Sequence, residues 1–82
     1  MQDFLTLVGP NKVRVSHHAV ALFNRQWPGS TLRETRAYWF EFDNDGNLVD
    51  ADVPEQDDGP AAAAIADDCK AWLIDRTAPE WL

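Results

Sequence analysis

The chain has 82 residues, enough for one domain with a small hydrophobic core. Four Trp, four Phe and one Tyr supply bulky apolar side chains, so this core can form without a metal or a disulfide. The formal net charge of −7 at pH 7 argues against direct binding to nucleic acid or to an anionic membrane surface, because both ligands require clustered Lys and Arg.

The first half of the chain predicts two short strands followed by a helix. Phe4–Val8 and Val13–Val15 contain β-forming residues and are separated by a run of turn formers. Ser16 is a typical N-cap for a helix over about His17–Gln26, in which apolar residues recur at spacings of three and four. Pro28 then ends the helix, because the residue before a proline is pushed out of the α region.

The second half predicts a β-hairpin followed by another helix. Arg36–Phe42 and Asn47–Val53 form the two strands, and Asp43–Gly46 between them is a turn sequence whose glycine can take the left-handed conformation. Pro60 lies in the first turn of a helix to about Asp75, a position where proline is tolerated.

These elements follow one another in the order ββ-α-ββ-α. We therefore expect an α+β fold: a small single domain, residues 1–82, with an antiparallel sheet and two helices packed on it.

Negative charge is concentrated in one segment of the chain. Between residues 41 and 68 there is no Lys or Arg, but there are ten acids: Glu41, Asp43, Asp45, Asp50, Asp52, Glu55, Asp57, Asp58, Asp67 and Asp68. Like charges at this density raise the free energy of the compact state through repulsion. We therefore expect an acidic surface that binds the basic surface of another protein, with a solvated face that needs no partner as the alternative.

Aromatic residues near the acids are candidate anchors for such a partner, because interfaces favour large aromatic side chains. Tyr38, Trp39 and Trp81 are the candidates if their rings are exposed beside the acids. For Trp81 we also expect that the tail Ala78–Leu82 packs this tryptophan back onto the domain. A narrower hypothesis is DNA mimicry, in which the carboxylates replace phosphates in the groove of a nucleic-acid-binding host protein. A different alternative is a structural module in which exposed strand edges pair two copies into a homodimer.

The segment Glu41–Asp52 also approaches the pattern of a calcium loop. Acids stand at loop positions 1, 3, 5 and 12 and glycine at position 6. Two residues depart from the pattern, since the loop begins with Glu in place of Asp and ends with Asp in place of Glu. The flanking sequence predicts strands where an EF-hand has helices. A calcium-binding hairpin loop is therefore a second alternative, and we otherwise expect no metal and no cofactor.

Other reactive side chains do not form a catalytic pattern. His17 and His18 are adjacent, and neighbouring residues on a helix point too far apart to hold one metal ion. Cys69 stands on an apolar helical stripe, where a buried thiol is expected. It is the only cysteine, so no internal disulfide can form. With no leader-like or long apolar segment, we expect a cytoplasmic protein. Because these side chains form no catalytic pattern, we also expect that the protein is not an enzyme.

Three stretches of the sequence, Phe23–Pro28, Tyr38–Phe42 and Asp50–Gly59, resemble small uncharacterised proteins encoded on plasmids and other mobile elements of Gram-negative bacteria. The likeness covers much of the chain. That group has no assigned activity, so no functional residue is carried over. The resemblance implies an accessory role such as anti-restriction, anti-CRISPR or plasmid maintenance, in which many proteins are acidic inhibitors of a host protein.

Overall fold

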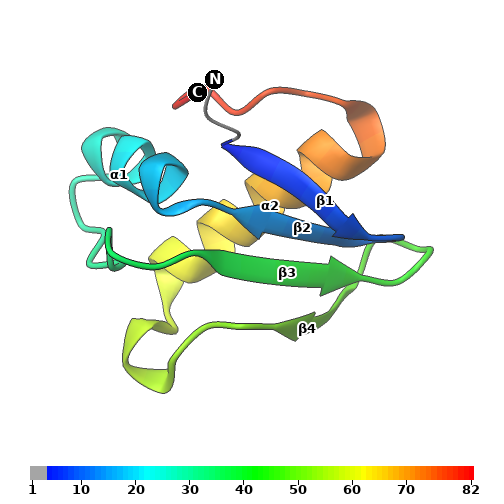
Figure 1. The fold of residues 1–82 in the computed structure, drawn as a ribbon, viewed down its shortest axis with the longest axis horizontal. Coiled ribbons are helices and arrows are strands. Elements are labelled where there is room, and N and C mark those ends of the chain that lie inside the picture. Colours follow the sequence, from blue (N-terminus) through cyan, green and yellow to red (C-terminus); the bar gives the residue numbers. More distant parts are fainter. Residues whose placement is uncertain (1–3) are drawn as a thin grey trace.

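The computed structural model describes residues 4–82 as a four-stranded antiparallel sheet with two helices on one face, which confirms the expected α+β fold (Figure 1). The strand order in the sheet, β1-β2-β3-β4, is the order along the chain. The elements are β1 (Leu5–Gly9), β2 (Lys12–Val15), α1 (His17–Gln26), β3 (Tyr38–Phe42), β4 (Leu48–Ala51), the short 3₁₀ turn η1 (Glu55–Asp57) and α2 (Pro60–Asp75).

The bounds of both helices agree with the prediction. The Ser16 hydroxyl accepts a hydrogen bond from the Ala19 backbone N–H at 3.3 Å, as an N-cap should. The second hairpin is shorter than predicted, since β3 begins at Tyr38 and β4 ends at Ala51. After β4 the chain leaves the sheet toward Pro54, which has no N–H to donate to a strand ladder.

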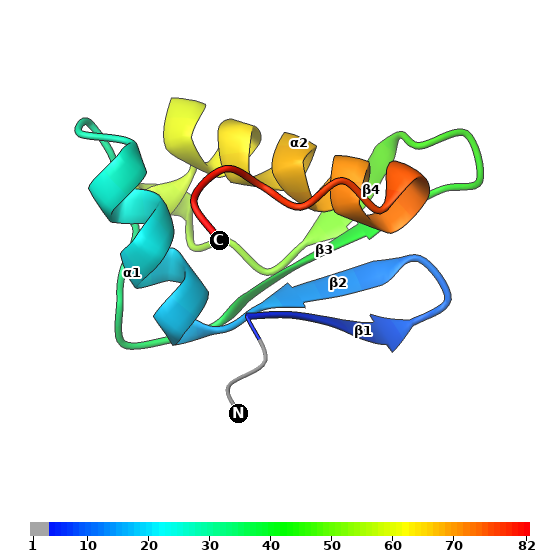
Figure 2. The same cartoon turned by 90° about the horizontal axis from the view of Figure 1, so that it is seen from above.

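Alternation along the central strands separates a buried face of the sheet from an exposed one. Val13 and Val15 on β2 and Tyr38, Phe40 and Phe42 on β3 are all buried. They pack against apolar residues of both helices in a single core. Figure 2 shows that α1 and α2 lie on the same side of the sheet. The core therefore occupies the space between the sheet and the helices.

The opposite face of the sheet carries the polar residues of the same strands. Lys12 lies opposite Glu41, and Arg14 lies opposite Trp39. The ammonium of Lys12 is 3.7 Å from the centroid of the Trp39 ring, a cation–π contact. Glu41 in turn lies opposite Asp50 on β4. This face therefore combines bases, one tryptophan and acids.

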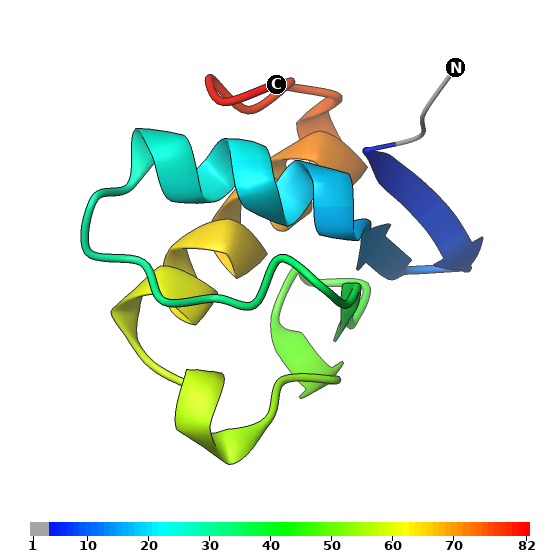
Figure 3. The same cartoon turned by 60° about the vertical axis from the view of Figure 1, so that its left-hand side comes forward.

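The segment 77–82 returns along α2 toward α1 (Figures 2 and 3). Arg76 permits this reversal by taking the left-handed conformation, with φ of 55°, as the C-cap of α2. Trp81 is then buried, and its ring meets that of Phe23 edge to face at 5.8 Å between centroids. The expectation that this tryptophan packs back onto the domain is confirmed.

Neither of the two helices described within residues 4–82 combines the length and the hydrophobicity that crossing a membrane requires.

Candidate functional site

Asp57 is buried, with an exposed fraction of 9%, and its carboxylate is part of a structural cluster. Its Oδ2 accepts a hydrogen bond from the Tyr38 hydroxyl at 2.8 Å and lies 3.5 Å from Nε of Arg33. The Tyr38 hydroxyl also accepts a hydrogen bond from the Arg33 backbone N–H at 2.9 Å. Burial, together with the bond to Asp57, raises the pKa of Tyr38 above its usual 10.0. These contacts join η1 to β3 and to the loop before it.

Two further acids have partners within the fold. The Asp52 carboxylate pairs with the guanidinium of Arg36 at 2.6 Å. Asp43 accepts hydrogen bonds from the backbone N–H groups of Asn47 and Asp45 at 2.8 and 2.9 Å. The bond from Asn47 is the main cause that lowers the pKa of Asp43 below its usual 3.8. Both carboxylates thus stabilise the second hairpin.

The ten acids do not form one continuous surface, contrary to the acidic surface expected from the sequence. Glu41 and Asp50 lie opposite each other on the sheet face that no helix covers. Asp67 and Asp68 belong to α2, on the other side of the sheet. Acids that are close in the sequence are therefore not close in space. Side chains of the hairpin strands alternate between the two faces of the sheet, and the chain then crosses to the helical layer.

Most of the acids are nevertheless free of a basic partner. Among residues 4–82, only Asp52 and Asp57 of the ten form salt bridges. The exposed members of the set are Asp45, Asp50, Glu55, Asp58 and Asp67. Each of these five is therefore available to a partner, whereas Asp52 and Asp57 are already engaged.

The aromatic anchors proposed from the sequence need correction. Tyr38 and Trp81 have exposed fractions of only 1% and 7%, so their prediction as surface anchors is wrong. Tyr38 occupies an inward position on β3, and Trp81 packs on Phe23. Trp39 points outward and is half-buried under the side chain of Lys12.

The hairpin turn does not have the surroundings of a calcium loop. Strands β3 and β4 flank it, and oxygens of Asp43 accept hydrogen bonds from the turn itself. Within residues 4–82 no group of three or more His, Cys, Asp or Glu side chains is arranged to hold a metal ion. The Asp and Gly residues of this segment serve the geometry of the turn, in which Gly46 has φ of 84°.

Cys69 is fully buried in the core, as expected. Burial raises the pKa of its thiol far above the usual value, and the nearby charge of Asp68 adds to this effect. The thiol therefore stays protonated and is unsuited to act as a nucleophile.

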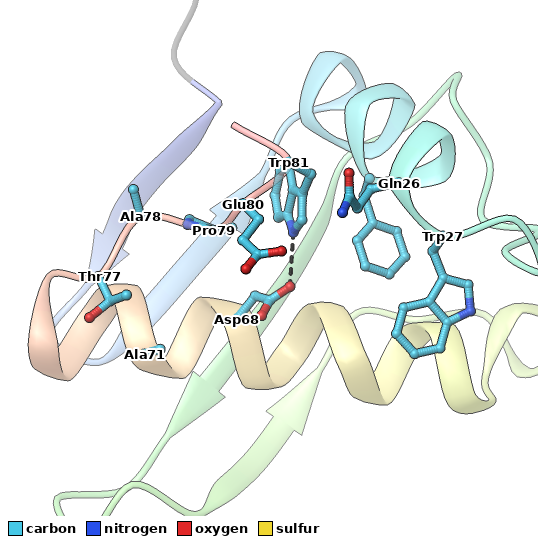
Figure 4. Close-up of a pocket in the computed structure, with 10 residues that line it drawn as sticks. Gln26, Trp27, Asp68, Ala71, Thr77, Ala78, Pro79, Glu80 and Trp81 are labelled. Atoms are coloured by element: carbon cyan, nitrogen blue, oxygen red, sulfur yellow. Dashed lines mark hydrogen bonds between the residues drawn. The ribbon is translucent and has the colours of Figure 1, made fainter.

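A cleft of about 410 Å³ lies between the end of α1, the middle of α2 and the segment 77–82 (Figure 4). It is lined by Phe23, Gln26, Trp27, Asp68, Ala71, Thr77, Ala78, Pro79, Glu80 and Trp81. Two carboxylates and three aromatic rings share these walls, and none of the lining residues is Lys, Arg or His. The cleft therefore joins negative charge to apolar surface.

Hydrogen bonding and ring packing fix the walls of this cleft. Asp68 Oδ2 accepts a hydrogen bond from the Trp81 indole Nε1–H at 2.8 Å (Figure 4). Phe23 lies between two tryptophans, stacked on Trp27 at 5.7 Å and edge to face with Trp81. Trp27 keeps 39% of its surface exposed.

Sequence reasoning named Asp68 and Trp81 but missed their association with each other and with Trp27 and Glu80. Asp68 and Trp81 are 13 residues apart in the chain. No local pattern predicts that the segment after α2 reverses at Arg76 and returns along the helix.

A second concavity, of about 300 Å³, lies between β4 and the first half of α2. Its lining is almost entirely apolar and consists of Phe40, Leu48, Ala51, Val53, Asp58, Ala62, Ala63 and Ala66. Asp58 is the one charged residue among them. This groove therefore offers apolar surface for contact but few polar groups that could bind a ligand.

Comparison with known proteins does not assign a family. No protein-family model, no curated protein and no solved structure matches the chain. The resemblance to proteins of plasmids and mobile elements therefore stays a prediction, and a function has to be inferred from the geometry and charge of the molecule itself.

Proposed function

We propose that this protein is an acidic protein-binding module that docks on a basic surface of another protein. The observation that carries the proposal is the set of five exposed acids, Asp45, Asp50, Glu55, Asp58 and Asp67, none of which has a salt-bridge partner among residues 4–82. A basic surface facing some of these carboxylates would supply the counter-charge that the fold does not give them.

The charge also suggests how the complex would form. Exposed acids attract a basic partner over distances of about 10 Å at 0.1 M salt, and this attraction speeds encounter. The association rate should therefore fall steeply as salt is added. A basic surface of this kind is common on proteins that bind nucleic acid, so an inhibitor of such a host protein is one form of the proposed function.

DNA mimicry is the narrowest form of the proposal, and the structure supports it less than the general form. A mimic needs carboxylates in a row comparable to a phosphate backbone. Here Glu41 and Asp50 lie on the uncovered sheet face, whereas Asp67 lies on α2. We therefore propose the broader function of binding to a basic protein, acting in the cytoplasm, where a single free thiol such as Cys69 is ordinary.

The test is capture of a partner by the immobilised protein, followed by binding measurements with the purified partner at several salt concentrations. A variant in which the five exposed acids become Asn or Gln should bind at least tenfold more weakly, and the difference should shrink at high salt. Far-ultraviolet circular dichroism verifies that the variant is folded. Equal affinity of wild type and folded variant would exclude the proposal.

The choice of variant follows from the structure. Replacing Asp57 would break its hydrogen bond with Tyr38, so a loss of binding could reflect unfolding. A matched control is the double variant Glu34→Gln and Asp75→Asn, two exposed acids outside the segment 41–68. It should bind more tightly than the double variant Asp45→Asn and Asp58→Asn, which has the same net charge.

The alternative of a homodimer has one supporting observation. The edge strand β4 exposes Leu48 and Val49 by 50% and 58%, and exposed apolar edges can pair. Pairing through β4 would also bring Asp50 of one copy near the same residue of the other, which opposes association. Light scattering over a range of concentrations tests it: a dimer that Val49→Lys dissociates would support this function over ours.

A further inference from the structure

We infer that the cleft between α1, α2 and the segment 77–82 binds an arginine side chain of the protein partner. The inference rests on the proposed function, because the partner is taken to be a basic protein. It assigns a defined binding pocket to a function that otherwise depends only on exposed acids at separate places on the surface.

The charge of the cleft is negative. Asp68 and Glu80 both line it, and no basic residue does. Neither of these acids forms a salt bridge within residues 4–82. Two carboxylates at one concavity repel each other, and a cation between them removes that repulsion. The ligand expected from charge alone is therefore a cation.

The carboxylate of Asp68 has a fixed orientation at the cleft. Its Oδ2 is held by the Trp81 indole N–H at 2.8 Å, and Trp81 is itself buried against Phe23. The carboxylate is thus oriented before any ligand arrives, while its Oδ1 forms no hydrogen bond with residues 4–82 and is free to accept one. Preorganised acceptors of this kind lower the entropic cost of binding.

The aromatic wall of the cleft selects between cations. Trp27 lines the cleft, is stacked on Phe23 and has 39% of its total surface exposed. A guanidinium is planar, stacks on aromatic rings and donates hydrogen bonds to carboxylates in a fork geometry. An ammonium is compact and strongly hydrated, so it gains less from the same wall. The combination of indole and carboxylates therefore favours arginine over lysine.

The volume agrees with a side chain presented by a protein. A cleft of about 410 Å³ is at the small end of the range for ligand pockets, roughly 300–1,000 Å³. The half-buried Ala71 can cover the methylene stem of an arginine, while its head lies between Asp68 and Glu80.

The test uses a short end-blocked peptide with one arginine, and the same peptide with citrulline, which has nearly the same shape without the charge. Nuclear magnetic resonance titration of the isotope-labelled protein follows the indole N–H signals of Trp27 and Trp81. We expect saturable shifts of both signals with the arginine peptide, and at least tenfold weaker binding for the citrulline peptide and for a lysine peptide.

Two acids on α2 provide a matched pair of variants. Asp68→Asn keeps an oxygen that can accept from Trp81 but removes the charge, and it should weaken binding of the arginine peptide about tenfold. Asp75→Asn makes the same change of charge on the same helix, at an exposed position that neither lines the cleft nor belongs to the five acids of the proposed function, and it should leave binding within about twofold. Glu80→Gln tests the second carboxylate without touching the indole hydrogen bond.

The outcomes separate this site from the proposed function. Equal weakening by Asp75→Asn and Asp68→Asn, or equal binding of the arginine and citrulline peptides, would overturn the cleft as an arginine site. Capture of a basic partner that depends on the five exposed acids but not on Asp68 would overturn the cleft and leave the proposed function standing. Arginine binding at the cleft in a protein that captures no basic partner would support the site and contradict the function.

Discussion

Asp57 and Asp58 are neighbours in the chain, and their surroundings are opposite. Asp57 is buried at the junction of η1, β3 and the loop before β3, where it accepts a hydrogen bond from Tyr38 and pairs with Arg33. Asp58 is exposed at the start of the segment leading into α2. The same contrast recurs on α2, where Asp68 holds Trp81 and Asp67 faces water.

The comparison separates two kinds of acid within one base-free segment. Acids of the first kind have a partner in the fold, so their removal should cost stability. Acids of the second kind have no such partner, and their removal should cost little or even stabilise the protein by reducing repulsion. Binding to a basic partner, in the proposed function, depends on the second kind. Four predictions test this division, in order of decreasing effect.

The largest effect is expected for Asp57→Ala. The substitution leaves the buried Tyr38 hydroxyl without its acceptor and Arg33 without its counter-charge. We expect a loss of about 2–3 kcal/mol in the free energy of unfolding, measured by urea denaturation. Asp58→Ala, the matched neighbour, should stay within about 0.5 kcal/mol of wild type. Similar losses in the two variants would contradict the division.

A smaller effect is expected for Asp68→Ala. The Trp81 indole N–H loses its acceptor, and the segment 77–82 loses one of its attachments to α2. We expect a loss of about 1 kcal/mol. Asp67→Ala should again change the free energy of unfolding by less than about 0.5 kcal/mol. The urea midpoints of the two variants provide the comparison, and Asp68→Asn should lie between them because it retains an oxygen acceptor.

The Tyr38–Asp57 junction also predicts a dependence on alkaline pH. Burial raises the pKa of Tyr38 in the folded protein above 10.0, so above that pH the unfolded chain binds fewer protons than the folded one. The contribution of Tyr38 to the free energy of unfolding is therefore fully present below pH 10, and it is lost as pH rises through the pKa of Tyr38 in the folded protein. Tyr38 is the only tyrosine, so ultraviolet absorbance of its phenolate reports this titration directly. A Tyr38→Phe variant should lack this part of the alkaline loss.

The smallest effect concerns Asp43 in the exposed hairpin turn. Hydrogen bonds from the turn lower the pKa of Asp43 below 3.8, so its contribution is present above the unfolded pKa and is lost as pH falls through the folded value. Asp43→Asn should reduce the acid-induced loss of stability slightly and leave the alkaline behaviour unchanged. Denaturation midpoints between neutral pH and pH 3 would show this, and identical acid profiles would contradict it.

Local patterns in the sequence were sufficient for the secondary structure. The Ser16 cap, the proline after α1 and the proline that opens α2 fix both helices, because the constraints they impose act within a turn or two. The Asp43–Gly46 turn and the alternation of β3 likewise fix the second hairpin. Strand ends were predicted less well, since they depend on where pairing with the neighbouring strand stops.

The candidate site could be predicted only in part. Asp68 was recognised through charge, and Trp81 was expected to pack on the domain, but their hydrogen bond and the contribution of Glu80 were missed. Tyr38 and Trp81 were also considered as surface anchors, which their burial excludes. The residue type alone does not indicate whether an aromatic ring faces the core or the solvent. Only the residues that surround the ring in the folded structure decide this.

The sequence by itself determined the order of elements, the two helices and the excess of negative charge, because each of these is set by residue type or by contacts within a few positions. Tertiary structure alone decided which carboxylates meet an arginine or an indole and which face water. The side chains of adjacent residues on a helix point about 100° apart. A chain that passes from a strand to a helix also moves from the sheet layer to the helical layer. Neighbouring acids such as Asp67 and Asp68 therefore acquire different environments, and with them different roles.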